Sequence, residues 1–196
     1  MKIKKTYVSY TRFINVGRRA FFIELDERGV SIDEVDIAKQ AVHFPYVVLT
    51  GQEPFLQRDA VAKLVTKIIK LNPTVKIEIH TNGTIRPVKI GTFENVIYYV
   101  NLKLKHSNIK YEDRIKPNII EFFVGCNTYF IFNIKTKDDI DESAMIAQNF
   151  GVPKGQVFIK PAIENIDDVW YSEFILLVKN YGYNIGIEVE INDNNE

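Results

Sequence analysis

The sequence contains very little cysteine and no evident metal-ligand pattern. Its 196 residues include one cysteine, Cys126. A single thiol can form neither an internal disulfide nor a site ligated by three or four cysteines. The three histidines, His43, His80 and His106, are not spaced like metal ligands. We therefore expect no metal site and no cysteine-ligated iron–sulfur cluster, and no cofactor is required by composition.

An excess of one charge and long apolar runs are also lacking. Lys and Arg number 25, as do Asp and Glu, so the formal net charge is zero and a nucleic-acid surface is not indicated. No apolar run reaches the roughly 20 residues needed to span a bilayer. No apolar signal core follows the basic N-terminus. We therefore expect a cytoplasmic protein that does not contact membranes.

What is present is an alternation of short apolar runs with helical patterns. Strands are expected at residues 19–25, 46–50, 75–80, 95–100, 129–134, 157–160 and 185–191. Helices are expected at residues 60–71, 119–124, 138–150 and 167–181, and a short one through Val35, Ile37, Ala38 and Ala41. Ser31 and Glu34 form a candidate capping box for the first helix, and residues 107–117 are expected to be a loop.

This order predicts an α/β fold with a mostly parallel sheet, either a partial (β/α) barrel or a curved open sheet with helices on its outer face. The whole chain, 1–196, is expected to be a single domain. Residues 1–18 would be an N-terminal extension or an edge strand, and residues 192–196 a frayed tail.

Polar clusters follow three of the predicted strands. Thr50–Pro54 reads TGQEP, His80–Thr84 reads HTNGT, and Asn101–Lys103 is followed by His106. The carboxyl ends of parallel strands share one edge of a sheet, and ligands bind at that edge in such folds. We therefore expect the three clusters to meet there.

Each cluster has a structural and a functional interpretation. Gly51 would let backbone approach a ligand closely. Glu53 could accept hydrogen bonds from an ammonium group or simply favour a helix N-terminus. The segment Thr81–Thr84 also suits a tight turn. Lys103 and His106 could bind an anion or move a proton, or lie on a solvated loop. Motifs this short favour the structural interpretation.

Together the clusters resemble one family, the radical S-adenosylmethionine (SAM) enzymes. Val47–Pro54 is similar to their TGGEP segment, and Thr81–Thr84 to the ETNGT segment of 7-carboxy-7-deazaguanine synthases, which rearrange a pterin. Asn101–Lys103 is similar to the SPK segment of these synthases, and Phe158–Pro161 to their late strand. The resemblance covers residues 21–191 and implies an abridged radical SAM core. The residues that it implies for a SAM site are Gly51, Gln52, Glu53, His80, Asn82, Gly83 and Lys103.

The chain departs from this family at its redox centre. The family has a CxxxCxxC loop after its first strand, and the three thiolates bind a 4Fe–4S cluster. Here Leu25 continues into Asp26–Gly29 without a cysteine. Gln52 replaces the second glycine of TGGEP, and His80 replaces the glutamate before TNGT. The resemblance therefore implies a protein without the cluster, which is not a functional radical SAM enzyme on its own.

Two functional hypotheses follow. The favoured one is a non-catalytic radical SAM-like protein that acts as a binding, scaffold or regulatory protein, through a protein partner, a second copy of itself or a small-molecule ligand. The alternative is an enzyme that binds SAM or a purine-like or pterin-like ligand at the strand ends. An open pocket lined by Glu53, His80, Asn82 and Lys103 would favour ligand binding. A pocket filled by Gln52 and aromatic side chains would favour a scaffold. No catalytic residue is assigned.

Overall fold

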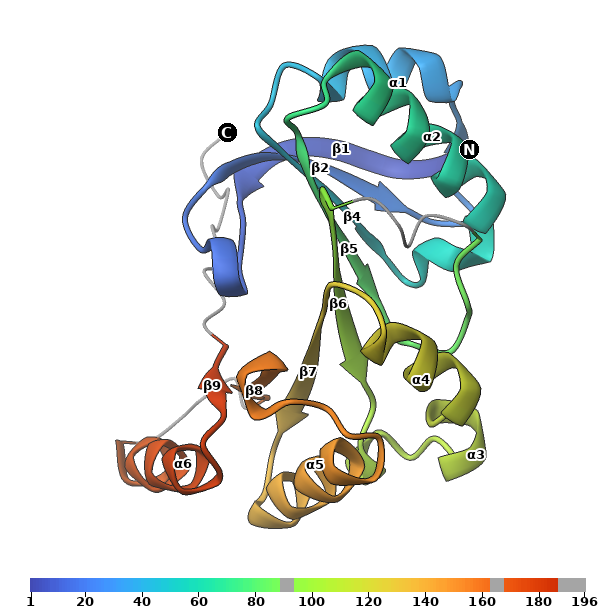
Figure 1. Ribbon diagram of the computed structural model, residues 1–196. Helices are drawn as coiled ribbons and strands as arrows, with labels where there is room; N and C mark the ends of the chain where they lie inside the picture. Colours follow the sequence, from blue (N-terminus) through green and yellow to red (C-terminus); the bar gives the residue numbers. More distant parts are fainter. Residues whose placement is uncertain (89–93, 163–167, 187–196) are drawn as a thin grey trace.

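The computed structural model describes residues 1–88, 94–162 and 168–186, with the side chains of 168–170 excepted (Figure 1). The strands in these residues are β1 (Lys2–Tyr10), β2 (Arg19–Leu25), β3 (Val30–Ser31), β4 (Tyr46–Gly51), β5 (Lys76–Thr81), β6 (Val96–Leu102), β7 (Thr128–Ile134), β8 (Val157–Pro161) and β9 (Asn184–Ile185). The α-helices are α1 (Glu34–Ala41), α2 (Arg58–Leu71), α3 (Tyr111–Arg114), α4 (Pro117–Val124), α5 (Lys137–Asn149) and α6 (Asp168–Tyr181).

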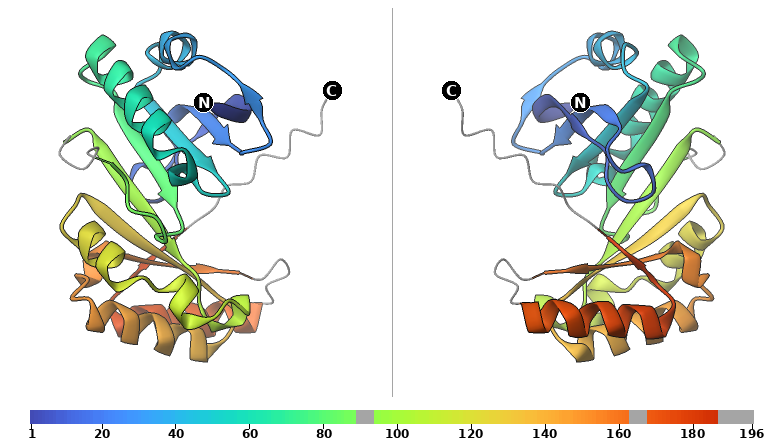
Figure 2. Two further views of the ribbon diagram at one scale, coloured as in Figure 1. Left: turned by 90° about the vertical axis from the view of Figure 1, so that its right-hand side faces the viewer. Right: turned by 90° about the vertical axis from the view of Figure 1, so that its left-hand side faces the viewer.

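The nine described strands form one open sheet in the order β3-β1-β2-β4-β5-β6-β7-β8-β9. All neighbours from β2 to β9 are parallel, whereas β1 pairs antiparallel with β2 and with β3. The sheet curves, and the α-helices lie along its outer side (Figures 1 and 2). The expected α/β fold with a mostly parallel, curved open sheet is confirmed.

Strand β4 shows how the sequence produces this architecture. Its central residues, Val47–Thr50, are β-branched or aliphatic, and they alternate between the two faces of the sheet. Val47 and Leu49 belong to the large core under the helices, whereas Val48 packs with Ala20 and Phe22 on the inner face. All five side chains are buried. A parallel strand that is apolar on both faces must be packed against other residues on both faces. The helices pack on one face of β4, and the β1 side of the sheet packs on the other.

A segment between β1 and β2 reaches across the open side of the curved sheet. It contains a short 3-10 helix, η1 (Phe13–Asn15), drawn in blue on the inner side in Figure 1. The Phe13 ring lies 4.9 Å from the ring of Tyr99 in β6 and 5.5 Å from that of Phe158 in β8. A Cβ placed on Gly186, just after β9, would lie 3.0 Å from Phe13. The N-terminal part of the chain thus contacts the far flank of the sheet.

Three expectations need comment. The predicted Ser31–Glu34 capping box is wrong, because Ser31 is held in β3 by pairing with Lys2, and Asp33 caps α1 by accepting from the Val35 N–H at 2.6 Å. The expected loop at 107–117 contains α3. Residues 187–191 of the last predicted strand and the 192–196 tail lie outside the described residues. Within the described part, no helix is long and apolar enough to cross a bilayer.

Candidate functional site

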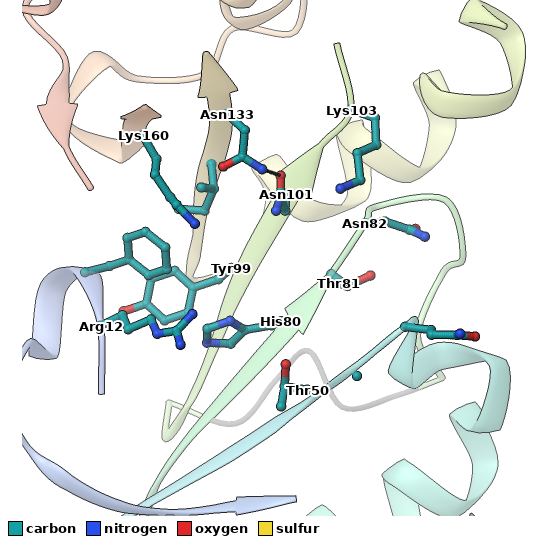
Figure 3. Close-up of a pocket in the computed structure, with 14 residues that line it drawn as sticks. Arg12, Thr50, His80, Thr81, Asn82, Tyr99, Asn101, Lys103, Asn133 and Lys160 are labelled. Carbon is teal, nitrogen blue, oxygen red and sulfur yellow. Dashed lines mark hydrogen bonds between the residues drawn. The ribbon is translucent and has the colours of Figure 1, made fainter. Parts of the chain in front are cut away.

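A pocket of about 260 Å³ lies on the inner face of the sheet, where β4, β5, β6, β7 and β8 approach their carboxyl ends (Figure 3). Its described lining consists of Arg12, Phe13, Thr50, Gly51, Gln52, His80, Thr81, Asn82, Tyr99, Asn101, Lys103, Ile131, Asn133 and Lys160. The three polar clusters of the sequence therefore meet at one edge, because the strands that carry them are parallel neighbours.

Five of the seven residues expected at a SAM site line this pocket. They are Gly51, Gln52, His80, Asn82 and Lys103. Glu53 and Gly83 are not among the lining residues, and both have roles inside the protein. The pocket thus has part of the lining expected for ligand binding, together with the Gln52 and aromatic side chains expected of a scaffold.

Glu53, which follows β4, connects this strand to the end of β5 through hydrogen bonds. Its carboxylate accepts hydrogen bonds from the Thr81 hydroxyl at 2.8 and 2.9 Å, from the Asn82 N–H at 2.8 Å and from the Phe55 N–H at 3.0 Å. The side chain is only 6% exposed. Burial raises the pKa of Glu53 above its ordinary value, although these hydrogen bonds act in the opposite direction. Its oxygens are therefore engaged within the protein.

The two motif glycines are also explained by contacts within the chain. Gly51 has φ of 123°, and a Cβ there would lie 2.0 Å from the carbonyl oxygen of Leu25. Gly83 has φ of 74°, and a Cβ there would lie 2.7 Å from a methyl group of Val100. Both positions combine a left-handed conformation with a close approach that only glycine permits.

The pocket is cationic. Arg12 comes from the segment before η1, Lys103 follows β6, and Lys160 belongs to β8 (Figure 3). No carboxylate side chain is among the described lining residues. Basic side chains that converge from separate elements on one cavity suit a carboxylate or phosphate, with which they form charge-assisted hydrogen bonds.

Three buried polar atoms of the lining have no hydrogen-bond partner in the described structure, His80 Nε2, Tyr99 Oη and Asn133 Oδ1. Glu78 lies behind His80 and is fully buried. Its Oε2 is 3.9 Å from His80 Nε2 and also lacks a hydrogen-bond partner. Its Oε1 accepts a hydrogen bond from Asn15 Nδ2 at 2.8 Å. Buried polar atoms are rarely left unpaired in native proteins. Such atoms at a cavity wall indicate a place where a ligand or water forms the missing bonds.

Aromatic rings form the apolar part of the lining. Tyr99 is 1% exposed and lies 5.1 Å from the His80 ring and 4.9 Å from the Phe13 ring. Burial raises the pKa of Tyr99, so its hydroxyl stays protonated at neutral pH. Phe13 has φ of 57°, an uncommon conformation for a large side chain. A flat apolar surface beside cationic groups suits a planar ring that carries an acidic group.

Several lining residues were not expected from the sequence. Asn133 and Lys160 stand near the carboxyl ends of predicted strands, so the polar residue that closes each strand was a usable signal. Arg12 and Phe13 had no such signal, because they come from the antiparallel N-terminal segment. Their position depends on that segment crossing the open side of the sheet.

The residues present do not fit a cysteine-ligated cluster. Cys126, the single cysteine of the chain, lies between α4 and β7, at the amino end of the strands and thus at the end of the sheet opposite the pocket. Its thiol donates to the Phe122 carbonyl at 3.3 Å, and burial raises its pKa. Residues Asp26–Gly29, after β2, form a turn closed by a 2.8 Å backbone hydrogen bond. The described residues contain no group of three or more His, Cys, Asp or Glu side chains arranged for a metal ion.

Comparisons with known proteins agree with the motifs. No family model matches the chain. It is 24% identical over 177 residues to a 7-carboxy-7-deazaguanine synthase of Pyrobaculum aerophilum, covering 79% of this chain and 76% of the relative. It is 28% identical over 137 residues to a protein of Methanocaldococcus jannaschii named as a candidate glycyl-radical enzyme activating enzyme, covering 60% of this chain and 56% of the relative.

The fold has a solved counterpart in SuiB of Streptococcus suis. The TM-score is 0.56 with 14% sequence identity, and the match covers 84% of this chain. The chain spans 44% of the SuiB chain, less than half of its length. This likeness shows the fold alone. The two sequence relatives support a relationship to the radical SAM superfamily.

Proposed function

We propose that this chain is a non-catalytic, radical SAM-like binding protein, which holds a small planar ligand with an acidic group and does not carry an iron–sulfur cluster. The observation that carries this proposal is the pocket lining. It contains three cationic side chains and no described carboxylate, together with three buried polar atoms that have no described hydrogen-bond partner. An acidic ligand could form charge-assisted hydrogen bonds at this lining and pair the buried polar atoms.

The ligand class that fits best is a carboxylated pterin or purine. The ring would lie against the partly exposed Phe13, and its carboxylate would reach Arg12 or Lys160. The relative from Pyrobaculum aerophilum is named as a synthase of a carboxylated deazaguanine, which is a ring system of this kind. The lining and the relative therefore favour the same ligand chemistry.

SAM itself fits this lining less well. Its sulfonium and ammonium groups are cationic, and the described charged side chains of the pocket are cationic too. Glu53, which the resemblance aligns with a contact to the amino end of SAM, has its oxygens engaged by Thr81, Asn82 and Phe55. A SAM complex would require this set of bonds to rearrange.

The proposal is tested by calorimetric titration with pterin-6-carboxylate, uncharged pterin and SAM. We expect saturable binding of pterin-6-carboxylate, weaker binding of pterin and none of SAM. Lys160→Met should weaken pterin-6-carboxylate binding roughly tenfold or more, the scale of one hydrogen bond to a charged group. Lys154→Met is the matched control, because Lys154 is exposed just before the amino end of β8, whereas Lys160 lies near its carboxyl end. Equal binding of the two pterins would contradict the proposal.

The enzymatic alternative has one observation in its favour. His80 lies in the pocket with the buried carboxylate of Glu78 behind it, an arrangement that could hold or move a proton. Mass spectrometry of pterin-6-carboxylate after incubation with the protein separates the two functions. Recovery of unchanged ligand supports binding alone, whereas conversion would support the enzyme.

A scaffold role also has an observation in its favour. Four apolar side chains on β1 and the following segment are 46–52% exposed, namely Val8, Tyr10, Ile14 and Val16. Neighbouring exposed apolar residues are typical of a surface that contacts a protein. Sedimentation velocity over a range of concentrations would detect self-association through this surface. If the protein is a monomer at all concentrations, a partner at this surface would have to be a different protein.

A further inference from the structure

A second cavity, of about 330 Å³, lies beside the pocket described above, between the segment after β6 and the end of β7. Two lysines line it, Lys103 and Lys135, together with the ring of His106 and the apolar side chains of Leu104 and Ile109. No carboxylate is among its described lining residues. The charge of this cavity therefore also favours an anion.

His106 is oriented by a buried carboxylate. Its Nδ1 lies 2.9 Å from Asp139 Oδ1, and the Asp139 side chain is 5% exposed. The other oxygen of Asp139 accepts from the backbone N–H groups of Lys135 at 2.8 Å and Thr136 at 3.0 Å, at the start of α5. Both oxygens are thus committed, and the carboxylate cannot turn away from the histidine.

The direction of this hydrogen bond decides which ring nitrogen is available. Burial alone would raise the pKa of Asp139, but the hydrogen bonds from His106, Lys135 and Thr136 outweigh burial and lower it. An ionised carboxylate can only accept, so Nδ1 carries the proton. Neutral imidazole has one N–H, and the unprotonated nitrogen is therefore Nε2. In the neutral ring of His106, a lining residue of the cavity, Nε2 is thus the nitrogen that can accept a hydrogen bond.

The segment that carries Lys103 and His106 is held firmly. The buried Arg114 donates to the Lys103 carbonyl at 2.9 Å and to Glu142 Oε1 at 2.7 Å. Glu142 Oε2 in turn accepts from the Lys105 N–H at 2.8 Å. These bonds fix residues 103–105, just before His106, to α3 and α5, so the geometry of this segment is set before any ligand arrives.

We propose that this cavity is a second ligand site, for a small oxyanion that carries a hydroxyl group: Lys103 and Lys135 neutralise the charge, and His106 Nε2 accepts the hydroxyl hydrogen bond. Hydrogen phosphate and hydroxycarboxylates share this chemistry. Lys103 lines both cavities, but His106 and Lys135 do not line the first pocket, so the hydroxyl preference at His106 can be tested separately from the proposed function.

The first test is the position of the proton on His106. Long-range ¹H–¹⁵N spectra of the full chain at pH 8 distinguish the two ring nitrogens. We expect the proton on Nδ1 and a bare Nε2, and the signals are assigned through loss of the His106 resonances in His106→Gln. A proton on Nε2 in the wild-type protein overturns the proposal, whatever the ligand.

The second test uses paired anions that differ in one hydroxyl group. Phosphate and sulfate both carry two charges at pH 8, but only phosphate has a hydroxyl; lactate and propionate form the corresponding carboxylate pair. We expect saturable shifts of the His106 ring signals, with phosphate or lactate bound about tenfold more tightly than its partner, the scale of one hydrogen bond. The preferred pair identifies the source. Equal affinity within both pairs, or no shift, overturns the proposal.

Variants distinguish the hydrogen bond accepted by His106 from the electrostatic attraction of the lysines. Asp139→Asn can donate to Nδ1 and so move the ring proton to Nε2, which should abolish the preference for the hydroxylated anion. Asp138→Asn, the exposed neighbour in the first turn of α5, is the matched control and should keep it. Lys135→Met should weaken both anions of a pair equally while the preference remains. Preference retained in a folded Asp139→Asn protein would contradict the role of His106.

Discussion

Glu53 accepts hydrogen bonds from groups within the protein at the pocket edge. From the sequence alone, the ammonium group of a ligand was an alternative partner for this carboxylate. The actual partners include Thr81 and Asn82, which are 28 and 29 residues away in the chain. A motif names the carboxylate, but it does not say which donors the fold brings to it. The same holds for His106, whose partner Asp139 is 33 residues away.

Replacing Glu53 with glutamine tests this role. Glutamine keeps the size of the side chain but has one acceptor oxygen, so a backbone N–H of Phe55 or Asn82 is left unpaired. We expect a loss of about 1–3 kcal/mol in the free energy of unfolding, measured by urea denaturation. Glu27→Gln, at an exposed position, is the control and should change little. An unchanged midpoint in Glu53→Gln would mean that the bridge does not stabilise the fold.

We also expect the difference in stability between the wild-type protein and Glu53→Gln to depend on pH. The pKa of Glu53 is raised in the folded state above its ordinary value of 4.5. The folded protein therefore binds this proton more tightly than the unfolded chain, and the stability that it contributes falls as pH rises from 4.5 through the folded pKa. Denaturation at a series of pH values should show the Glu53→Gln deficit largest at the acid end and smaller above this window. A deficit that grows with pH would contradict a raised pKa.

At the level of elements, the ends of β2 and β4 pair at Gly51, which also lines the pocket. Gly51 ends β4 opposite Leu25, the last residue of β2. Gly51→Ala would bring a Cβ to 2.0 Å from the Leu25 carbonyl at a positive φ. We expect a loss of about 3 kcal/mol or more in the free energy of unfolding.

The control for this variant is Gly155→Ala. Gly155 lies before β8, and a Cβ there would have no neighbour within 4 Å. Thermal and urea unfolding should leave the control close to wild type. Similar stability of Gly51→Ala and the control would show that the ends of β2 and β4 can separate without cost.

The regular elements were predictable because their signals are local. Strand β4 is a run of apolar residues, and α2 repeats apolar residues at helical spacing, with Val61, Leu64, Val65 and Ile68 buried. Strand β1 was left open as an extension or an edge strand, because its sequence, KIKKTYVSY, is strongly charged at its start. Its pairing with β2 depends on a partner that follows it in the chain, which local patterning cannot reveal.

At the scale of the whole molecule, the position of the single cysteine predicts that the protein does not assemble an iron–sulfur cluster. Cys126 and the pocket lie at opposite ends of the strands, and the turn after β2 has no cysteine. After anaerobic incubation with iron and sulfide and removal of the excess, we expect no cluster absorption and less than one iron per chain. A radical SAM enzyme with an intact CxxxCxxC loop is the control. Four irons and four sulfides per chain would contradict this expectation.

The candidate site was predictable only in part for a related reason. Parallel strands bring the ends of β4, β5 and β6 together, so Gly51, His80 and Lys103 could be placed at one edge from the sequence. Arg12 reaches the same cavity only because the segment before β2 crosses the open side of the sheet. That placement is a property of the assembled fold and has no signature in the residues around it.

The contact between Phe13 and Phe158 also bears on the order of folding. These residues are separated by most of the chain, and closing so long a loop is entropically unfavourable until the strands between them are in place. The contact is therefore expected among the last to form, after the parallel strands have assembled. The first pocket, which has Phe13 and Arg12 in its wall, would be completed in the same late step.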